Sequence, residues 1–145
     1  MAKEILPAEN IILNASPASQ EEAIREAGRL LVEGGYTDEH YIDKMFEREE
    51  MSSTFMGNFV AIPHGTDDAK DSVYHSGMSV IQVPEGVDYG SGNTAKLIFG
   101  IAGKNNEHLE LLSKIAILCS EEENIERMLN ATTKEELLAM FSEVE

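Results

Sequence analysis

The sequence of 145 residues has 27 acidic and 11 basic side chains, a formal net charge of −16 at pH 7, and an ordinary hydrophobic content of 42%. So acidic a surface repels phosphate backbones and anionic lipids, which argues against nucleic-acid binding or membrane insertion and favours a basic protein partner. Cys119 is the single cysteine and the sequence has neither a signal-peptide core nor a long apolar run, so we expect a cytoplasmic protein without disulfides.

The N-terminal part of the chain predicts one strand and two helices. Residues 10–14 are typical of a short buried strand. Ser19 and Glu22 form a capping box that starts the first helix, and the glycine pair at 34–35 ends it. We expect the second helix to begin at Thr37. Its inner face is expected to consist of Tyr41, Ile42, Met45 and Phe46, with Arg48 near its C-terminal end.

The middle of the chain predicts two strands followed by a helix. Residues 76–84 and 95–102 are apolar and typical of strands, and the segment 85–93 between them is rich in Gly, Asp, Ser and Asn and predicts a loop. Asn105 or Asn106 is expected to cap the next helix. Because that helix has a broad apolar surface, we expect it to be the most buried helix of the chain.

Two further capping boxes predict the last two helices, one formed by Ser120 with Glu123 and the other by Thr133 with Glu136. The sequence contains no internal repeat and no linker. Helices mingled with short strands in this order predict the α/β class. We expect a single-domain sandwich over residues 1–145, in which a small mixed β-sheet is flanked by helices on both faces.

A histidine stands at the end of the apolar segment 58–62. Pro63 fixes the backbone before His64, and Gly65 leaves room beside its ring. The acidic segment 67–71 that follows predicts only a short helix. The imidazole of His64 is therefore expected to be presented at an element's end, although a structural histidine at a strand-to-loop junction has the same local pattern.

Phosphoryl transfer gives several polar residues a common purpose. The imidazole of His64 can act as nucleophile and leaving group near neutral pH. His108, in the first turn of its helix and on the inward side, can donate one hydrogen bond, as can Arg48, the Thr66 hydroxyl and the backbone after Gly65. Taken separately, His108 is equally consistent with a histidine at the core edge and Arg48 with a solvated helix end.

The segment Val60-Ala61-Ile62-Pro63-His64-Gly65, with Arg48-Glu49 upstream, resembles a known active-histidine signature. It is that of the enzyme IIA components of the mannitol and fructose branch of the bacterial phosphoenolpyruvate-dependent sugar phosphotransferase system. The resemblance implies that His64 accepts a phosphoryl group from HPr and passes it to a cysteine on the IIB domain of the sugar permease. It further implies that Arg48 and His108 stabilise the phosphate and that the fold is a mixed α/β sandwich. We expect neither a cofactor nor a metal.

The segments 53–58 and 103–108 look most like the mannitol-specific members. Three alternatives stay open. The chain resembles fructose-specific and nitrogen-related regulatory members as well, and the latter act through phosphorylation-dependent partner binding. A metal site or hydrolase built from His64, Asp67, His75 and His108 is the third, although no compact ligand motif supports it.

Either an acidic or an apolar surface could dock to HPr. The acidic surface around His64 can meet a positive patch on the donor. If docking is instead mainly apolar, Met56, Phe59 and Val60 are the candidate contacts, although such strand residues are more often buried in the core.

Overall fold

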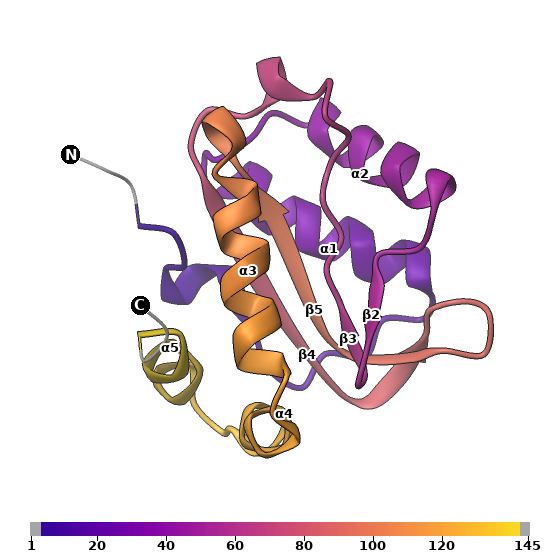
Figure 1. Cartoon of the computed structure of the whole chain (residues 1–145), viewed down its shortest axis with the longest axis vertical. Coiled ribbons are helices and arrows are strands. Elements are labelled where there is room, and N and C mark those ends of the chain that lie inside the picture. The colour runs from indigo at the N-terminus through magenta and orange to yellow at the C-terminus, as the bar shows by residue number, and fades with distance from the viewer. Residues whose placement is uncertain (1–3, 143–145) are drawn as a thin grey trace.

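A mixed β-sheet forms the centre of the computed structural model, which describes residues 4–142 (Figure 1). Its strands are β1 (Ile11–Ile12), β2 (Phe55–Gly57), β3 (Val60–Ala61), β4 (Gly77–Asp88) and β5 (Thr94–Ala102). They lie in the order β1-β4-β5-β3-β2. The pairs β1·β4 and β3·β5 are parallel, while β4·β5 and β2·β3 are antiparallel. The prediction of a small mixed sheet is confirmed.

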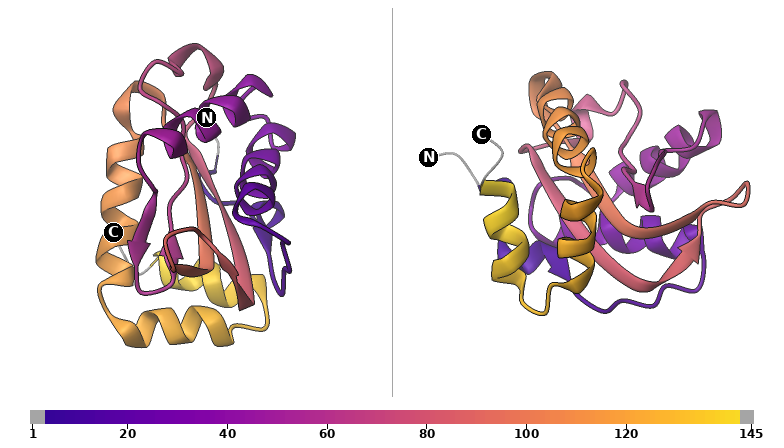
Figure 2. Two further views of the ribbon diagram at one scale, coloured as in Figure 1. Left: turned by 90° about the vertical axis from the view of Figure 1, so that its right-hand side faces the viewer. Right: turned by 60° about the horizontal axis from the view of Figure 1, so that its bottom comes forward.

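Helices cover both faces of the sheet (Figure 2). The first layer is α1 (Gln20–Glu33) and α2 (His40–Met51), and the second is α3 (His108–Cys119), α4 (Glu122–Asn130) and α5 (Lys134–Ser142). Successive strand residues alternate between the two layers. Ile81 and Ile98 pack in the cluster that contains α1, whereas Val80 and Phe99 pack in the cluster that contains α3. The predicted α/β sandwich with helices on both faces is therefore confirmed.

Two of the three predicted capping boxes start their helices. The Ser19 hydroxyl accepts a hydrogen bond from the Glu22 N–H at 3.2 Å at the start of α1. The Thr133 hydroxyl accepts from the Glu136 N–H at 3.3 Å at the start of α5. The third prediction was wrong. Ser120 is the C-cap of α3, where its hydroxyl donates to the Ile117 carbonyl at 2.7 Å, and the N-cap position of α4 is Glu121, which makes no side-chain cap bond.

The start of α2 was also predicted too early. Thr37 forms an isolated antiparallel bridge with Val73 and is therefore extended. The helix starts at His40, where the Asp38 carboxylate accepts a hydrogen bond from the Tyr41 N–H at 3.1 Å. The tertiary bridge to Val73 thus overrides the capping preference of a threonine, and an aspartate supplies the cap one residue later.

The predicted loop over 85–93 is shorter in the structure, because β4 continues to Asp88. The register of β4 against β5 shifts between Gln82 and Val87, after which Val87 pairs with Ala95. Gly86 has φ +79°, a left-handed conformation that glycine adopts at such a bulge without strain. The remaining connection comprises residues 89–93.

The start of α3 also differs from expectation. Asn105 and Asn106 do not cap the helix but adopt left-handed φ values of 57° and 69° in a short 3₁₀ turn, Lys104–Asn106. The helix is not the most buried one, because Leu109 and Ile117 on its outer side are 60% and 59% exposed.

No helix within residues 4–142 has both the length and the apolarity that a membrane crossing requires.

Candidate functional site

His64 lies just beyond β3, at the edge of the sheet where β3 and β5 both end. It forms an isolated parallel bridge with Ile101 on β5. The Ile101 N–H donates to the Pro63 carbonyl at 3.1 Å, which fixes the peptide before His64. The side chain is half-buried. The prediction that this imidazole is presented at the end of an element is confirmed, because β3 ends at Ala61 and Pro63 precedes the histidine.

The orientation of the His64 ring fixes its tautomer. Nδ1 lies 2.8 Å from the Ile62 carbonyl oxygen. A carbonyl can only accept, so Nδ1 must carry the proton and Nε2 must carry the lone pair. Burial lowers the pKa of His64 below its ordinary value of 6.5; the Ile62 carbonyl opposes this, and the charge of Arg48 adds to it. The ring is therefore neutral near pH 7, with a nucleophilic Nε2.

His108 is the first residue of α3 and faces His64. The two ring centroids lie 6.5 Å apart and the ring planes are inclined by 27°. Gly103 allows the chain to turn tightly here, because a Cβ at that position would lie 2.0 Å from the His108 backbone nitrogen. Two histidines from distant parts of the sequence thus meet with nearly parallel rings, as the inward placement of His108 predicted.

The rings of His64 and His108 line a cleft of about 870 Å³. Its lining residues come from the start of α2, the segment after β3 and the turn before α3; they are Tyr41, His64, Gly65, Thr66, Asp67, Ala69, Lys70, Asp71, Val73, Gly103, Lys104, Asn105, Asn106, His108 and Leu109. The cleft carries both signs of charge, from Lys70 and Lys104 on one hand and Asp67 and Asp71 on the other. It is large enough for a phosphoryl group and for side chains of a docking protein.

Arg48 lies in the last turn of α2, where it was predicted. Its Nη1 donates to the Ser52 carbonyl at 3.0 Å and to the Ser52 hydroxyl at 3.1 Å. A guanidinium has five N–H donors, so these bonds leave donors for an anion. Arg48 is not among the cleft-lining residues, but its charge acts on the pKa of His64. The structure therefore brings His64 and His108 together and keeps Arg48 nearby, tied to Ser52.

Two of the predicted phosphate donors are engaged within the protein. The Gly65 N–H donates to the Tyr41 hydroxyl at 2.9 Å, and the Thr66 hydroxyl donates to the Asp68 carboxylate. The helix predicted over 67–71 is reduced to a 3₁₀ turn, Lys70–Ser72. The expectation of a helix N-terminus directly after Gly65 was therefore wrong, because the chain makes its turn only several residues later.

Sequence reasoning missed the polar part played by Tyr41. Its position on the inner stripe of α2 predicted a core residue, and it is 4% exposed. Its hydroxyl, however, lies against the peptide that follows His64 and against the Ile101 carbonyl. Nothing in the local pattern distinguishes such a tyrosine from one that only packs, since the contact depends on how α2 crosses the end of the sheet.

The histidines and the cysteine outside this pair show no arrangement for catalysis. Within residues 4–142, no group of three or more His, Cys, Asp or Glu side chains could hold a metal ion. His75 is exposed and does not line the cleft with His64, Asp67 and His108. Cys119 is buried in α3, and burial raises the pKa of its thiol to about 12, as expected for a core residue.

The apolar contact candidates lie away from His64. Val60 is fully buried, so its proposed contact role was wrong. Met56 and Phe59 are exposed on the β2·β3 hairpin, and the Lys96 ammonium lies 4.8 Å from the centroid of the Phe59 ring. Val60 pairs with Leu97, four residues before the Ile101 that bridges His64, so the hairpin tip lies about 13 Å or more along the sheet from the imidazole.

Comparison with known proteins gives consistent matches over nearly the whole chain. Residues 4–144 match the family described as phosphoenolpyruvate-dependent sugar phosphotransferase system, EIIA 2. The mannitol-specific phosphotransferase enzyme IIA component of Bacillus subtilis is 65% identical over 141 residues, which cover 97% of this chain and 99% of that protein. The corresponding protein of Geobacillus stearothermophilus is 62% identical over 144 residues, 99% of each chain.

Solved structures agree with the sequence matches. The complex of enzyme IIAMTL and phosphorylated enzyme IIBMTL from Escherichia coli contains a chain that superposes with a TM-score of 0.90 at 40% identity, covering 94% of this chain and 96% of that one. The structural similarity therefore extends over nearly the whole of both chains.

Proposed function

The chain belongs to the EIIA 2 family of the phosphoenolpyruvate-dependent sugar phosphotransferase system, and we propose that it is a phosphocarrier with His64 as its phosphoryl acceptor. His64 takes the group from phosphorylated HPr and passes it to a cysteine of a IIB domain. The observation that carries this proposal is the state of the imidazole. Its Nδ1 proton is bound to the Ile62 carbonyl, and the ring is neutral in a cleft shared with His108.

The chemistry is two successive displacements at phosphorus. The Nε2 lone pair of His64 attacks the phosphoryl group, and the P–N bond to the donor histidine breaks, so that its electron pair stays on the donor nitrogen. In the second step a cysteine thiolate of the IIB domain attacks the same phosphorus, and the P–Nε2 bond breaks with its electron pair returning to His64. Throughout, the Nδ1–H···O=C bond to Ile62 holds the proton on the nitrogen that does not react.

His108 and Arg48 are proposed to bind the phosphoryl oxygens during both steps. His108 is suited because its ring faces His64 at 6.5 Å between centroids, which leaves room for a tetrahedral group between them. Arg48 is suited because its guanidinium is anchored on Ser52 through Nη1 and has further N–H donors. Donors fixed in place before reaction stabilise the charge of the transition state without reorganisation.

We assign the carrier to mannitol uptake, because the relatives named above are mannitol-specific IIA components and one solved neighbour is bound to phosphorylated enzyme IIBMTL. The sugar does not contact a carrier of this kind, so the assignment concerns the choice of IIB partner. A cytoplasmic location forms part of the proposal, and a buried thiol at Cys119 suits a reducing compartment. Residues 1–145 are proposed to act as a single phosphocarrier domain.

The test is the intact mass of the purified protein after incubation with phosphoenolpyruvate, enzyme I and HPr. We expect a gain of one acid-labile phosphoryl group in the wild type and none in His64→Ala. His40→Ala and His75→Ala are matched controls, because both side chains are exposed and lie outside the cleft, and both should accept the group normally. Phosphorylation that persists in His64→Ala would overturn the proposal.

A second experiment distinguishes a mannitol-specific carrier from a fructose-specific carrier and from a regulator. The phosphorylated protein is mixed with a IIB domain of a mannitol permease and, separately, with one of a fructose permease. Fast transfer to the mannitol IIB alone supports the assignment. Preferential transfer to the fructose IIB would indicate a fructose-specific carrier, and transfer to neither would indicate a regulator that acts by phosphorylation-dependent binding.

A further inference from the structure

The Tyr41 hydroxyl joins two backbone groups beside the His64 ring. The Gly65 N–H donates to it at 2.9 Å, and it donates to the Ile101 carbonyl at 2.7 Å. In parallel pairing around the bridge between His64 and Ile101, the Gly65 N–H and the Ile101 carbonyl face each other. The Tyr41 hydroxyl hydrogen-bonds to both of these groups on the side that follows His64, whereas on the side before it the Ile101 N–H bonds to the Pro63 carbonyl.

The Tyr41 ring also sets the distance between α2 and the segment after His64. A Cβ at Gly65 would lie 2.5 Å from Cε1 of Tyr41, so this packing requires a glycine. Burial raises the pKa of the Tyr41 hydroxyl to about 12, against the effect of the Gly65 hydrogen bond. The hydroxyl therefore keeps its proton at neutral pH and can act as donor and acceptor at once.

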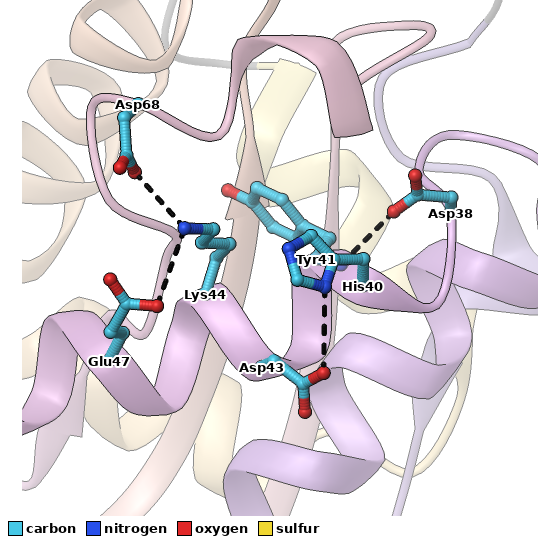
Figure 3. Close-up of polar contacts among 7 residues, drawn as sticks. All are labelled: Asp38, His40, Tyr41, Asp43, Lys44, Glu47 and Asp68. Carbon is cyan, nitrogen blue, oxygen red and sulfur yellow. Dashed lines mark hydrogen bonds and ion pairs between the residues drawn. The ribbon is translucent and has the colours of Figure 1, made fainter.

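Lys44 attaches the same segment to α2 at a second point, close to Tyr41 (Figure 3). Its ammonium lies 3.5 Å from the Asp68 carboxylate and 3.4 Å from that of Glu47. The two carboxylates are exposed, and ion pairs of this kind contribute little. The buried hydrogen bonds of Tyr41 are accordingly the stronger attachment, with Lys44 guiding the outer part of the segment.

We propose that Tyr41 is a positioning residue for phosphoryl transfer, because it fixes the peptide on the far side of His64 from Ile62. The ring is tied through Nδ1 to a carbonyl two residues earlier, and the peptide after it is tied to the Tyr41 hydroxyl. In-line attack by Nε2 requires the ring to be held within a fraction of an ångström. Tyr41 has this effect through the backbone. The inference rests on the proposed function, in which His64 is the acceptor.

The test is Tyr41→Phe, which removes the hydroxyl and keeps the ring. We expect the kcat of transfer from phosphorylated HPr to fall roughly tenfold with KM for HPr unchanged, since the docking surface is the same. Tyr36→Phe is the matched control. Tyr36 is also buried, packs its ring against a glycine and donates to a backbone carbonyl, that of Glu4, and it does not line the cleft.

Two-dimensional NMR supplies a readout that does not depend on activity. In Tyr41→Phe the amide resonance of Gly65 should shift and its hydrogen exchange should accelerate, because the Gly65 N–H loses its acceptor. Thermal unfolding of both variants controls for stability. If Tyr41→Phe does not fold, Gly65→Ala is the second variant, because it displaces the ring but keeps the hydroxyl, and the same loss of kcat is expected.

A wild-type kcat in Tyr41→Phe would overturn the role of Tyr41, as would an effect confined to KM. An equal loss in Tyr36→Phe would also overturn it, because the effect would then follow stability. These results differ from failure of the proposed function, in which the wild type itself would accept no phosphoryl group. Loss of kcat in Tyr41→Phe alone, with the Gly65 amide shifted, supports the proposal.

Discussion

Glu49 binds both polar groups of Thr54: its carboxylate accepts the backbone N–H at 2.8 Å and the hydroxyl at 2.6 Å. The same carboxylate accepts bonds from the side chains of Gln20 and Tyr89, both at 3.3 Å. Glu49 directly follows Arg48 near the end of α2, and Thr54 directly precedes β2. The network therefore fixes the connection between the arginine and the strands that lead to His64.

Replacement of Glu49 by Gln should destabilise the protein and slow phosphoryl transfer. A Gln side chain has one acceptor oxygen and must place an NH₂ group against donors, so part of the network is left unpaired at a cost of about 1–3 kcal/mol. Denaturant unfolding measures the stability, and single-turnover transfer from phosphorylated HPr measures the rate. Glu50→Gln, at the neighbouring exposed position, is the control and should change neither. Equal behaviour of the two variants would contradict this role.

His108→Gln should still accept a phosphoryl group on His64 but should do so slowly. A donor that faces the acceptor ring stabilises the transferring group, and loss of one such donor typically lowers the rate roughly 10²-fold to 10³-fold. Rapid-quench kinetics with phosphorylated HPr measures the change. His75→Gln serves as the control because His75 is exposed and outside the cleft. A wild-type rate in His108→Gln would show that the histidine pair is structural.

The lowered pKa of His64 predicts how transfer depends on pH. Burial is its largest cause, so the ring stays neutral somewhat further into acid than an exposed imidazole with a pKa of 6.5. The rate of phosphorylation should therefore fall, as Nε2 gains a proton, at a lower pH than it would for an exposed imidazole. A fall that begins above neutrality would contradict it. NMR titration of the His64 ring gives the pKa directly.

The lowered pKa of His64 also predicts that the free energy of unfolding decreases as the pH falls. A histidine in a salt bridge, whose pKa is raised, would have the opposite effect. As the pH falls below about 6.5, the unfolded chain binds a proton on His64 before the folded chain does, so the free energy of unfolding decreases until the lowered folded pKa is passed. His64→Gln should lack this component. Unfolding of both proteins between about pH 7 and pH 5 measures the difference between their pH dependences, which should be small near neutral pH.

Most helix starts and the position of His64 could be predicted from the sequence, because they depend on residues that are close together in the chain. Ser19 and Thr133 cap their helices through residues three positions away, and His64 follows a proline just beyond the end of β3. The failure at Thr37 has a tertiary cause, because that residue is drawn into a bridge with Val73. The cause at Ser120 is local, because that residue ends α3 and its hydroxyl bonds to the Ile117 carbonyl three positions earlier.

The candidate site was also predictable only in part. The spacing of His108 to the apolar residues of its helix correctly predicted that its ring faces inward, and general chemistry suggested what two imidazoles and an arginine could do. The bridging hydroxyl of Tyr41 could not be predicted, because it depends on how α2 crosses the ends of β3 and β5. Likewise, the sequence does not show that the Gly65 N–H is already hydrogen-bonded, because its acceptor is the side chain of a residue 24 positions earlier.

Transfer from HPr should weaken as salt rises, because the protein has a net charge of −16 and its cleft carries Asp67 and Asp71. Added salt screens the attraction to a basic donor, so KM for HPr should increase several-fold between about 0.05 and 0.5 M salt while kcat stays constant. Asp67→Asn with Asp71→Asn should reduce the slope. Glu123→Gln with Glu126→Gln, the same charge change on α4 and outside the cleft, should leave it nearly unchanged.

A KM that does not respond to salt would contradict electrostatic docking and would indicate an apolar contact instead. Leu109 is then the residue to test, because it is 60% exposed and lines the cleft one residue after His108. Leu109→Ser should raise KM in that case, whereas Phe59→Ser on the hairpin should not. Met56 and Phe59 lie at the other end of β3 from the imidazole, too far along the sheet to share a small interface centred on His64.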